Sequence, residues 1–145
     1  MQRLTALLDR YARRPAARRW IGPRPDVRDG RMAAAIAAQV GLPSVTGLVV
    51  VDALMSLTRA QAAHVLAVAG TTSLAYGRAD PRRGALAEAA EALAELGPTA
   101  VFLANGRWQE GPSLSWMPLT DATFECGVIG WDDQHAFVFW VEEED

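Results

Sequence analysis

The spacing of the hydrophobic positions changes near residue 98, from a helical period to an alternating one. Before this point apolar residues recur every three or four positions, and the first such run predicts an amphipathic helix over residues 2–14 through Leu4, Leu7, Leu8 and Tyr11. After it apolar and polar residues alternate, as in strands. This order predicts an α+β fold, with about four N-terminal helices packed on a C-terminal antiparallel sheet of four to five strands.

Three further helices are predicted from their start and stop signals: Asp29 to Gly41, Thr58 towards Gly70, and Asp80 to Gly97. Thr58 and Gln61 have the spacing of a capping box, in which each side chain accepts from a backbone N–H at the helix start. Asp80 and Pro81 combine an N-cap residue with proline at the first helical position. Gly41 and Gly97 end the first and third of these helices, and the second could continue irregularly from Gly70 to Tyr76.

Two segments between these helices are less regular. Pro15, Pro23 and Pro25 predict an extended or looped segment up to Arg28, because proline disfavours helix in the residue before it. The nearly all-apolar segment Leu42–Leu57 fits two structures. Val49 to Val51 favour a strand, whereas Ser44 could cap a buried helix, and we predict a helix.

The sheet is predicted from residue 98 onwards. Ala100–Ala104 is followed by Asn105-Gly106, which suits a type I′ turn and predicts a tight hairpin with Arg107–Gln109. Ser113–Leu119 supplies another strand, and its Pro118 favours an edge position. The last predicted hairpin spans Ala122–Asp145.

Both faces of the final strand are apolar. Because side chains alternate, Phe137, Phe139 and Val141 point one way, and Ala136, Val138 and Trp140 point the other. Such a strand is either central in a sheet that is covered on both sides, or it shows one apolar face to a partner.

The length of 145 residues fits one domain. We divide it into an Arg-rich helix and loop (1–31), a helical layer (32–97) and an antiparallel sheet (98–145). The sequence has no run of 18 apolar residues, and its Arg-rich start lacks the apolar region of a secretory signal. We therefore expect a cytoplasmic protein without membrane contact.

Charge is strongly asymmetric along the chain. Residues 1–31 hold nine Arg and three Asp, residues 32–107 hold five Arg and five acids, and residues 108–145 hold nine acids and no Arg. This asymmetry indicates either a charged partner or a meeting of the two ends in space. Neutralisation of the N-terminal arginines by part of the C-terminal acids is the interpretation we favour.

Few residues offer catalytic chemistry. His64 lies among apolar residues, and a core or helix-surface position suits it best. Cys126 and His135 could form a nucleophilic dyad if the thiol reached the ring, although Cys126 is also typical of a small buried hydrophobe. Asp132, Asp133 and His135 match no metal-binding motif, and the chain lacks phosphate-binding loops. We expect no cofactor and no metal.

The C-terminal region has the composition of a protein interface. Trp108, Trp116, Trp131, Phe139 and Trp140 could form an aromatic patch with acids at its rim, which would attract a basic protein. The predicted partner-binding residues are Trp131, Asp132, Asp133, Trp140, Glu142, Glu143, Glu144 and Asp145. Core tryptophans with a solubilising acidic tail explain the same composition equally well.

These features favour a non-catalytic bacterial protein that binds another protein. Its small, acidic, α+β character matches the general profile of immunity proteins and antitoxins that block basic toxins, which is an analogy of profile and not of motifs. Two alternatives stay open. One is a small hydrolase or transferase using Cys126 or His135, and the other is a nucleic-acid binder using the Arg-rich N-terminus.

Overall fold

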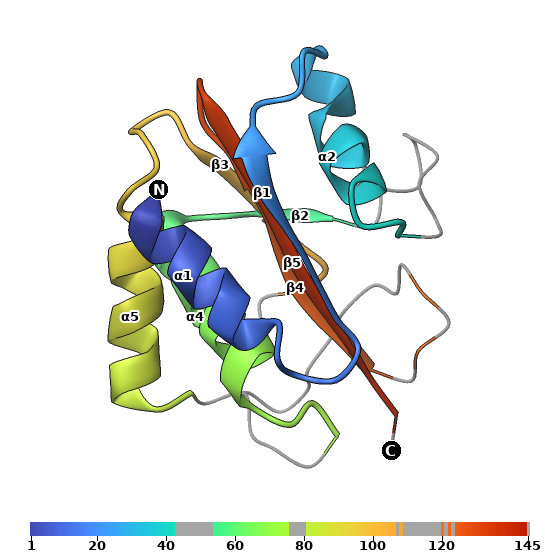
Figure 1. Ribbon diagram of the computed structural model, residues 1–145, viewed down its shortest axis with the longest axis vertical. Coiled ribbons are helices and arrows are strands. Elements are labelled where there is room, and N and C mark those ends of the chain that lie inside the picture. The colour runs from blue at the N-terminus through green and yellow to red at the C-terminus, as the bar shows by residue number, and fades with distance from the viewer. Residues whose placement is uncertain are drawn as a thin grey trace.

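The computed structural model describes residues 1–42, 54–75, 81–106, 108, 120, 122 and 124–144, which form an antiparallel sheet with helices on both faces (Figure 1). The sheet order is β1-β5-β4-β3-β2. The strands are β1 (Ala17–Pro23), β2 (Met55–Leu57), β3 (Val101–Ala104), β4 (Phe124–Trp131) and β5 (His135–Glu143). The helices of this part of the chain are α1 (Gln2–Tyr11), α2 (Asp29–Ala38), α4 (Arg59–Thr71) and α5 (Arg83–Leu93).

The α+β class and the antiparallel sheet are confirmed, but the predicted order of elements is wrong. Helices and strands are interspersed, since β1 follows α1 and β2 precedes α4. The sequence prediction placed every strand after residue 98, where the helical spacing of the apolar residues ends and the hairpin patterns lie. The two outer strands β1 and β2 lie in segments where proline or a continuous apolar run hides the pattern.

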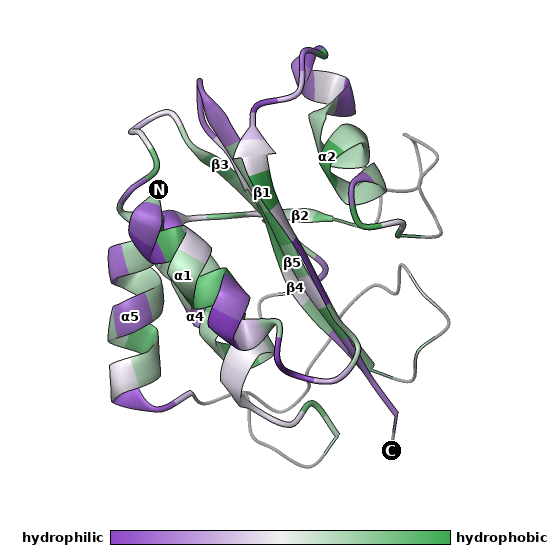
Figure 2. Ribbon diagram, viewed as in Figure 1, coloured by the Kyte–Doolittle hydropathy of each residue, from purple (hydrophilic) through white to green (hydrophobic). Residues whose placement is uncertain are grey.

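The β4–β5 hairpin is the centre of the molecule and is covered on both sides. Phe137, Phe139 and Val141 face α1, α4 and α5, whereas Val138 and Trp140 face α2. Figure 2 shows the two strands apolar along their middle and hydrophilic at the turn and at the C-terminal end. The sequence allowed either a central strand covered on both sides or a strand with one apolar face open to a partner. β5 is therefore the central strand covered on both sides.

β1 corrects the predicted loop after Pro15. It pairs antiparallel with β5 from Ala17, opposite Val141, to Pro23, opposite His135. The prolines fit this strand because β1 is an edge and Pro23 is its last residue. The pairing brings the Arg-rich segment beside the acidic end of the chain.

The predicted helices are present with shifted ends. α4 has the predicted capping box, with the Thr58 side chain accepting from the Gln61 N–H and the Gln61 side chain accepting from the Thr58 N–H. α2 begins at Asp29 after the N-cap Arg28, and Gly41 has the positive φ of 64° expected beyond a helix end. α5 begins at Arg83, later than predicted.

Other predictions for the helical and sheet regions are wrong or fall outside the described residues. Met55–Leu57 is a strand, not the end of a helix. β3 pairs with β2 on one side and with β4 on the other, so the prediction of a hairpin at Asn105-Gly106 is wrong. Residues 43–53, the Asp80 cap and the strand predicted over 113–119 lie outside the described residues.

Glycines allow aromatic rings to lie directly against the backbone. A Cβ atom at Gly127 would lie 2.3 Å from the Trp140 ring, and one at Gly130 would lie 2.5 Å from the Phe137 ring. At Gly70 of α4 the same atom would lie 2.2 Å from Tyr11 of α1. These separations are too short for any side chain, so the close approach of the rings requires glycine.

Candidate functional site

The acidic end of β5 is held by arginines of the N-terminal segment. Arg14, in the α1–β1 connection, makes an ion pair of 2.8 Å with Glu143, and it also donates to the Ala69 carbonyl near the end of α4 at 2.7 Å. Arg18 of β1 lies 2.6 Å from Glu142. The predicted neutralisation of N-terminal arginines by C-terminal acids is confirmed for these two pairs.

Glu143 also binds the segment after α4. It accepts from the Ser73 hydroxyl at 2.6 Å and from the Leu74 N–H at 2.8 Å. Burial raises the pKa of Glu143, but these donors, the Ala75 N–H and the Arg14 guanidinium outweigh it, so the pKa is lowered overall. Glu143 is therefore a charged link between β5, α4 and the α1–β1 connection.

A cavity of about 460 Å³ opens at this end of the sheet. Two elements line it, the α1–β1 connection and the end of β5, with Arg14, Pro15, Ala16, Glu142, Glu143 and Glu144. Ala16 has a positive φ of 57°, which turns the chain sharply into β1. The cavity thus combines an apolar wall with a row of carboxylates, and its Glu144 is exposed.

Asp132 at the opposite end of β5 is an internal cap. Its Oδ1 accepts from the N–H groups of Gln134 (2.8 Å) and His135 (2.7 Å), and its Oδ2 accepts from the Gly97 N–H (2.9 Å). Burial raises the pKa of Asp132, but the three donors outweigh it and the pKa is lowered. Asp132 thereby fixes the β4–β5 turn to the segment after α5.

The predicted acids do not form one patch within a single chain. Asp133 is exposed at the turn and accepts from the Thr99 hydroxyl at 3.1 Å, whereas Glu144 lies beyond the other end of β5. The nine residues of β5 separate them by about 30 Å at the usual rise per residue. Asp145 lies outside the described residues.

The aromatic patch predicted as a surface is core. Trp140 and Phe139 are fully buried, and Trp131 and Trp108 are 6% and 4% exposed. Trp140 and Trp131 pack against α2, because an apolar helix covers the face that the sequence left without an assigned partner. The tryptophan side chains of β4 and β5 therefore cannot meet another protein, and Trp116 lies outside the described residues.

Cys126 and His135 do not form a dyad. Cys126 faces Val141 on β5, six positions from His135, which corresponds to about 20 Å along the strand. Burial raises the pKa of Cys126 well above its usual value, and its thiol lies 3.8 Å from the Val65 carbonyl. A nucleophilic role for this pair is excluded by distance and by burial.

A buried polar chain joins α4 to the sheet. The His64 ring lies 2.5 Å from the Trp108 carbonyl, which fixes a proton on Nε2 because the carbonyl can only accept. The Trp108 indole lies 3.5 Å from the Asn105 side chain, which donates to the Glu125 carbonyl at 2.9 Å. Trp108 has a positive φ of 52°, so this set of hydrogen bonds holds a strained residue four positions after the end of β3.

Glu125 is the buried acid that the sequence prediction missed. Its carboxylate accepts from the Trp140 indole N–H at 2.7 Å and from the Thr120 N–H at 2.9 Å. On β4 it faces Glu142 across the ladder and is fully buried. A charged residue within the apolar run of a central strand was the available signal, since such a residue needs buried donors.

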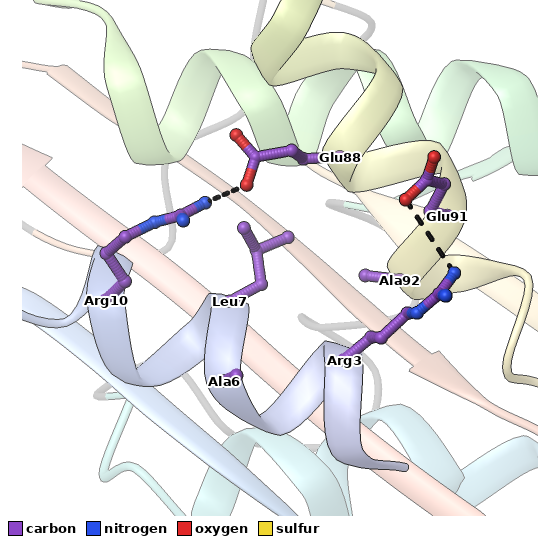
Figure 3. Close-up of a pocket in the computed structure, with 7 residues that line it drawn as sticks. All are labelled: Arg3, Ala6, Leu7, Arg10, Glu88, Glu91 and Ala92. Atoms are coloured by element: carbon purple, nitrogen blue, oxygen red, sulfur yellow. Dashed lines mark hydrogen bonds and ion pairs between the residues drawn. The ribbon is translucent and has the colours of Figure 1, made fainter.

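A shallow groove of about 280 Å³ lies between α1 and α5. Figure 3 shows Arg10 and Arg3 extending from α1 to Glu88 and Glu91 of α5, with distances of 2.5 and 3.7 Å. Leu7 lies between the two pairs. The charges of this groove are balanced by its own pairs.

The described residues contain no group of three or more side chains that could hold a metal ion, and no helix among them is long and apolar enough to cross a membrane. Comparisons with protein-family models, with curated proteins and with solved structures find no match to this chain.

Proposed function

We propose that this chain is a non-catalytic protein-binding protein of the cytoplasm that inhibits a basic partner, in the manner of an immunity protein or antitoxin. The observation that carries this proposal is the acid-lined cavity at the end of β5. It offers carboxylates to a positively charged side chain and an apolar wall of Pro15 and Ala16 to the stem of that side chain.

The carboxylates of the cavity are held in place before any partner arrives. Glu143 is oriented by Arg14 and the segment after α4, and Glu142 by Arg18. Preorganised groups lose little conformational freedom on binding, so more of their interaction with a partner appears as affinity. Glu144 is exposed beside them and is the residue we assign to first contact with the partner.

The alternatives draw less support from the structure. The enzyme alternative depends on Cys126, which is buried far from His135. The nucleic-acid alternative depends on N-terminal arginines, of which six pair with carboxylates of the same chain: Arg3, Arg10, Arg14, Arg18, Arg19 and Arg24.

The test begins with affinity capture of the tagged protein from its native lysate at low and high salt. The partner identified by mass spectrometry is then purified and its association rate measured for Glu144→Arg and for Asp26→Arg. Asp26 is another exposed acid, which follows β1 at the opposite end of β5, so it controls for the change in net charge. We expect Glu144→Arg to slow association about tenfold and Asp26→Arg to leave it within about twofold.

Equal association rates for both variants would refute binding at the cavity. Recovery of nucleic acid alone, lost on combined replacement of Arg13, Arg28 and Arg31 by Ala, would favour the nucleic-acid alternative. These three arginines make no ion pair with a described residue, so their replacement leaves the internal pairs intact.

A further inference from the structure

β1 is an edge strand, and the outward backbone groups of its middle residues Arg19 and Ile21 have no partner in the described part of the chain. The bonds from the Arg24 N–H to the Gln134 carbonyl and from the Glu142 N–H to the Ala16 carbonyl show that even-numbered residues exchange hydrogen bonds with β5. The N–H and C=O groups of Arg19 and Ile21 therefore point away from β5. In Figure 1, β1 lies in front of β5, with α1 on one side and α2 on the other.

The sequence limits this open edge to two residues. Pro23 has no N–H to donate, and the Ala17 N–H already donates to the Arg14 carbonyl at 3.3 Å. Arg19 and Ile21 are thus the two residues of this edge that offer both a donor and an acceptor outward. Such a set is complementary to itself when a second copy runs antiparallel, because each donor then meets an acceptor.

We propose that two copies of the chain pair through β1, with Trp20 opposite Trp20 of the second copy. In this register Arg19 faces Ile21 of the second copy, and all outward donors and acceptors of both residues are used. The two Trp20 residues form the non-hydrogen-bonded pair on the axis, where cross-strand aromatic contacts are closest. The two sheets become one continuous sheet.

Charge permits this contact although β1 carries two arginines. Arg18 is paired with Glu142 at 2.6 Å and Arg19 with Asp9 at 2.8 Å, so the edge is neutralised within each copy. A register centred on Arg19 would instead place the two Arg19 side chains directly opposite each other, which is destabilising. The register on Trp20 avoids this repulsion.

The dimer brings together acids that lie at opposite ends of β5 within one chain. Pairing of Ala17 with Pro23 of the second copy sets Val141 of one β5 three strand spacings, about 14 Å, from His135 of the other. Glu144 of one copy and Asp133 of the other then lie at the same end of the joined sheet. The dimer does not depend on the proposed function, and a mass measurement tests it separately from partner binding.

The first test measures molecular mass by sedimentation equilibrium for the natural chain, Arg19→Pro and Arg19→Ala. Proline removes the outward N–H without touching the ladder to β5, whereas alanine removes the same ion pair and keeps the N–H. We expect twice the 15.6 kDa chain mass for the natural protein and for Arg19→Ala, and the chain mass for Arg19→Pro. A monomeric natural protein, or a dimeric Arg19→Pro with unchanged circular dichroism, would overturn the proposal.

The second test fixes the register by oxidative cross-linking. Trp20→Cys places two thiols opposite each other on the axis, within the Cα separation that a disulfide accepts. Arg18→Cys is the matched control, because it faces Gly22 of the second copy and lies about 13 Å from its own counterpart. We expect a covalent dimer only for Trp20→Cys, and cross-linking of both variants or of Arg18→Cys alone would refute this register.

Discussion

The two ends of β5 are both acidic, but their carboxylates are held by different kinds of group. At the turn, Asp132 accepts from three backbone N–H groups, of Gly97, Gln134 and His135. At the other end, Glu142 and Glu143 face the guanidinium groups of Arg18 and Arg14. The turn therefore uses backbone donors of nearby segments, whereas the other end adds arginines from the far end of the sequence to the donors of Ser73 and Leu74.

This difference accounts for part of the charge asymmetry of the chain, since two of the nine N-terminal arginines pair with the acids at the end of β5. Only the second end holds its carboxylates with arginines, and they reach it because β1, which carries Arg18 and follows Arg14, pairs with β5 along its whole length. At the turn, burial raises the pKa of Asp132, but three backbone donors and, to a smaller extent, the His135 ring outweigh it. A cluster of acids in a sequence thus does not by itself measure the charge offered to a partner. The following variants test the contrast.

Asp132→Ala should have the largest effect. It leaves three N–H groups without their acceptor, one of which ties the turn to the segment after α5, and we expect a loss of about 3 kcal/mol in the free energy of unfolding. Urea denaturation measures this loss. Asp133→Ala, at the exposed neighbour, should cost less than about 0.5 kcal/mol. Equal effects would show that the cap is not what stabilises the turn.

Glu143→Ala should come next, with a loss of about 2 kcal/mol, because Ser73 and the Leu74 N–H lose an acceptor in a partly buried position. Glu144→Ala, one residue on, should change stability by less than about 0.5 kcal/mol. Since an arginine also holds Glu143, added salt should reduce the difference between natural protein and variant at this end more than at the turn. An unchanged difference would contradict a contribution from Arg14.

Acid should weaken both ends together, with a smaller effect than either variant. The pKa values of Asp132 and Glu143 are lowered in the folded protein, so their contribution is full above the ordinary carboxyl values, 3.8 and 4.5. It is lost as the pH falls through the folded values, where the native carboxylates take up protons. We expect the urea midpoint to fall steadily between pH 5 and about pH 2. Asp132→Asn should flatten this decline, and a parallel profile would refute the assignment.

Asp9→Ala should have the smallest effect and gives a baseline for exposed arginine pairs. Its partner Arg19 and the aspartate itself are both largely exposed, with side-chain exposures of 41% and 52%. Such pairs contribute less than about 0.5 kcal/mol, measurable as a shift in thermal midpoint of a few degrees at most. A loss as large as that of Glu143→Ala would mean that burial does not separate the two kinds of pair.

The sequence predicted the parts of the fold whose signals are local. The capping box at Thr58 and the helix of Leu4 to Tyr11 depend on neighbours within one turn, and both are present. β1 was missed because an edge strand with prolines has no alternating signal and is defined only by its partner β5. The burial of Trp131 and Trp140 could not be predicted from the sequence either, because it depends on where α2 packs.

For the site, the ion pairs between the two ends of the chain followed from the charge distribution, whereas their particular partners did not. Arg14 contacts Glu143 because the chain turns at Ala16, which has a positive φ. No sequence pattern predicts that conformation at an alanine. Glu125 was overlooked because its donors, Thr120 and Trp140, come from other parts of the chain.

The glycines beneath the aromatic rings have an evolutionary consequence. Gly130 can change only if Phe137 becomes smaller, because a Cβ atom there would lie 2.5 Å from the ring. A Cβ atom at Gly127 would lie 2.4 Å from the Phe139 carbonyl oxygen as well as 2.3 Å from the Trp140 ring, so a smaller residue at 140 would not make room for it. Substitutions at position 130 should therefore be inherited in pairs, so that a larger residue there accompanies a smaller one at 137, while glycine stays at 127. This covariation would allow a distant descendant of the same ancestor to be identified even after most other residues have diverged.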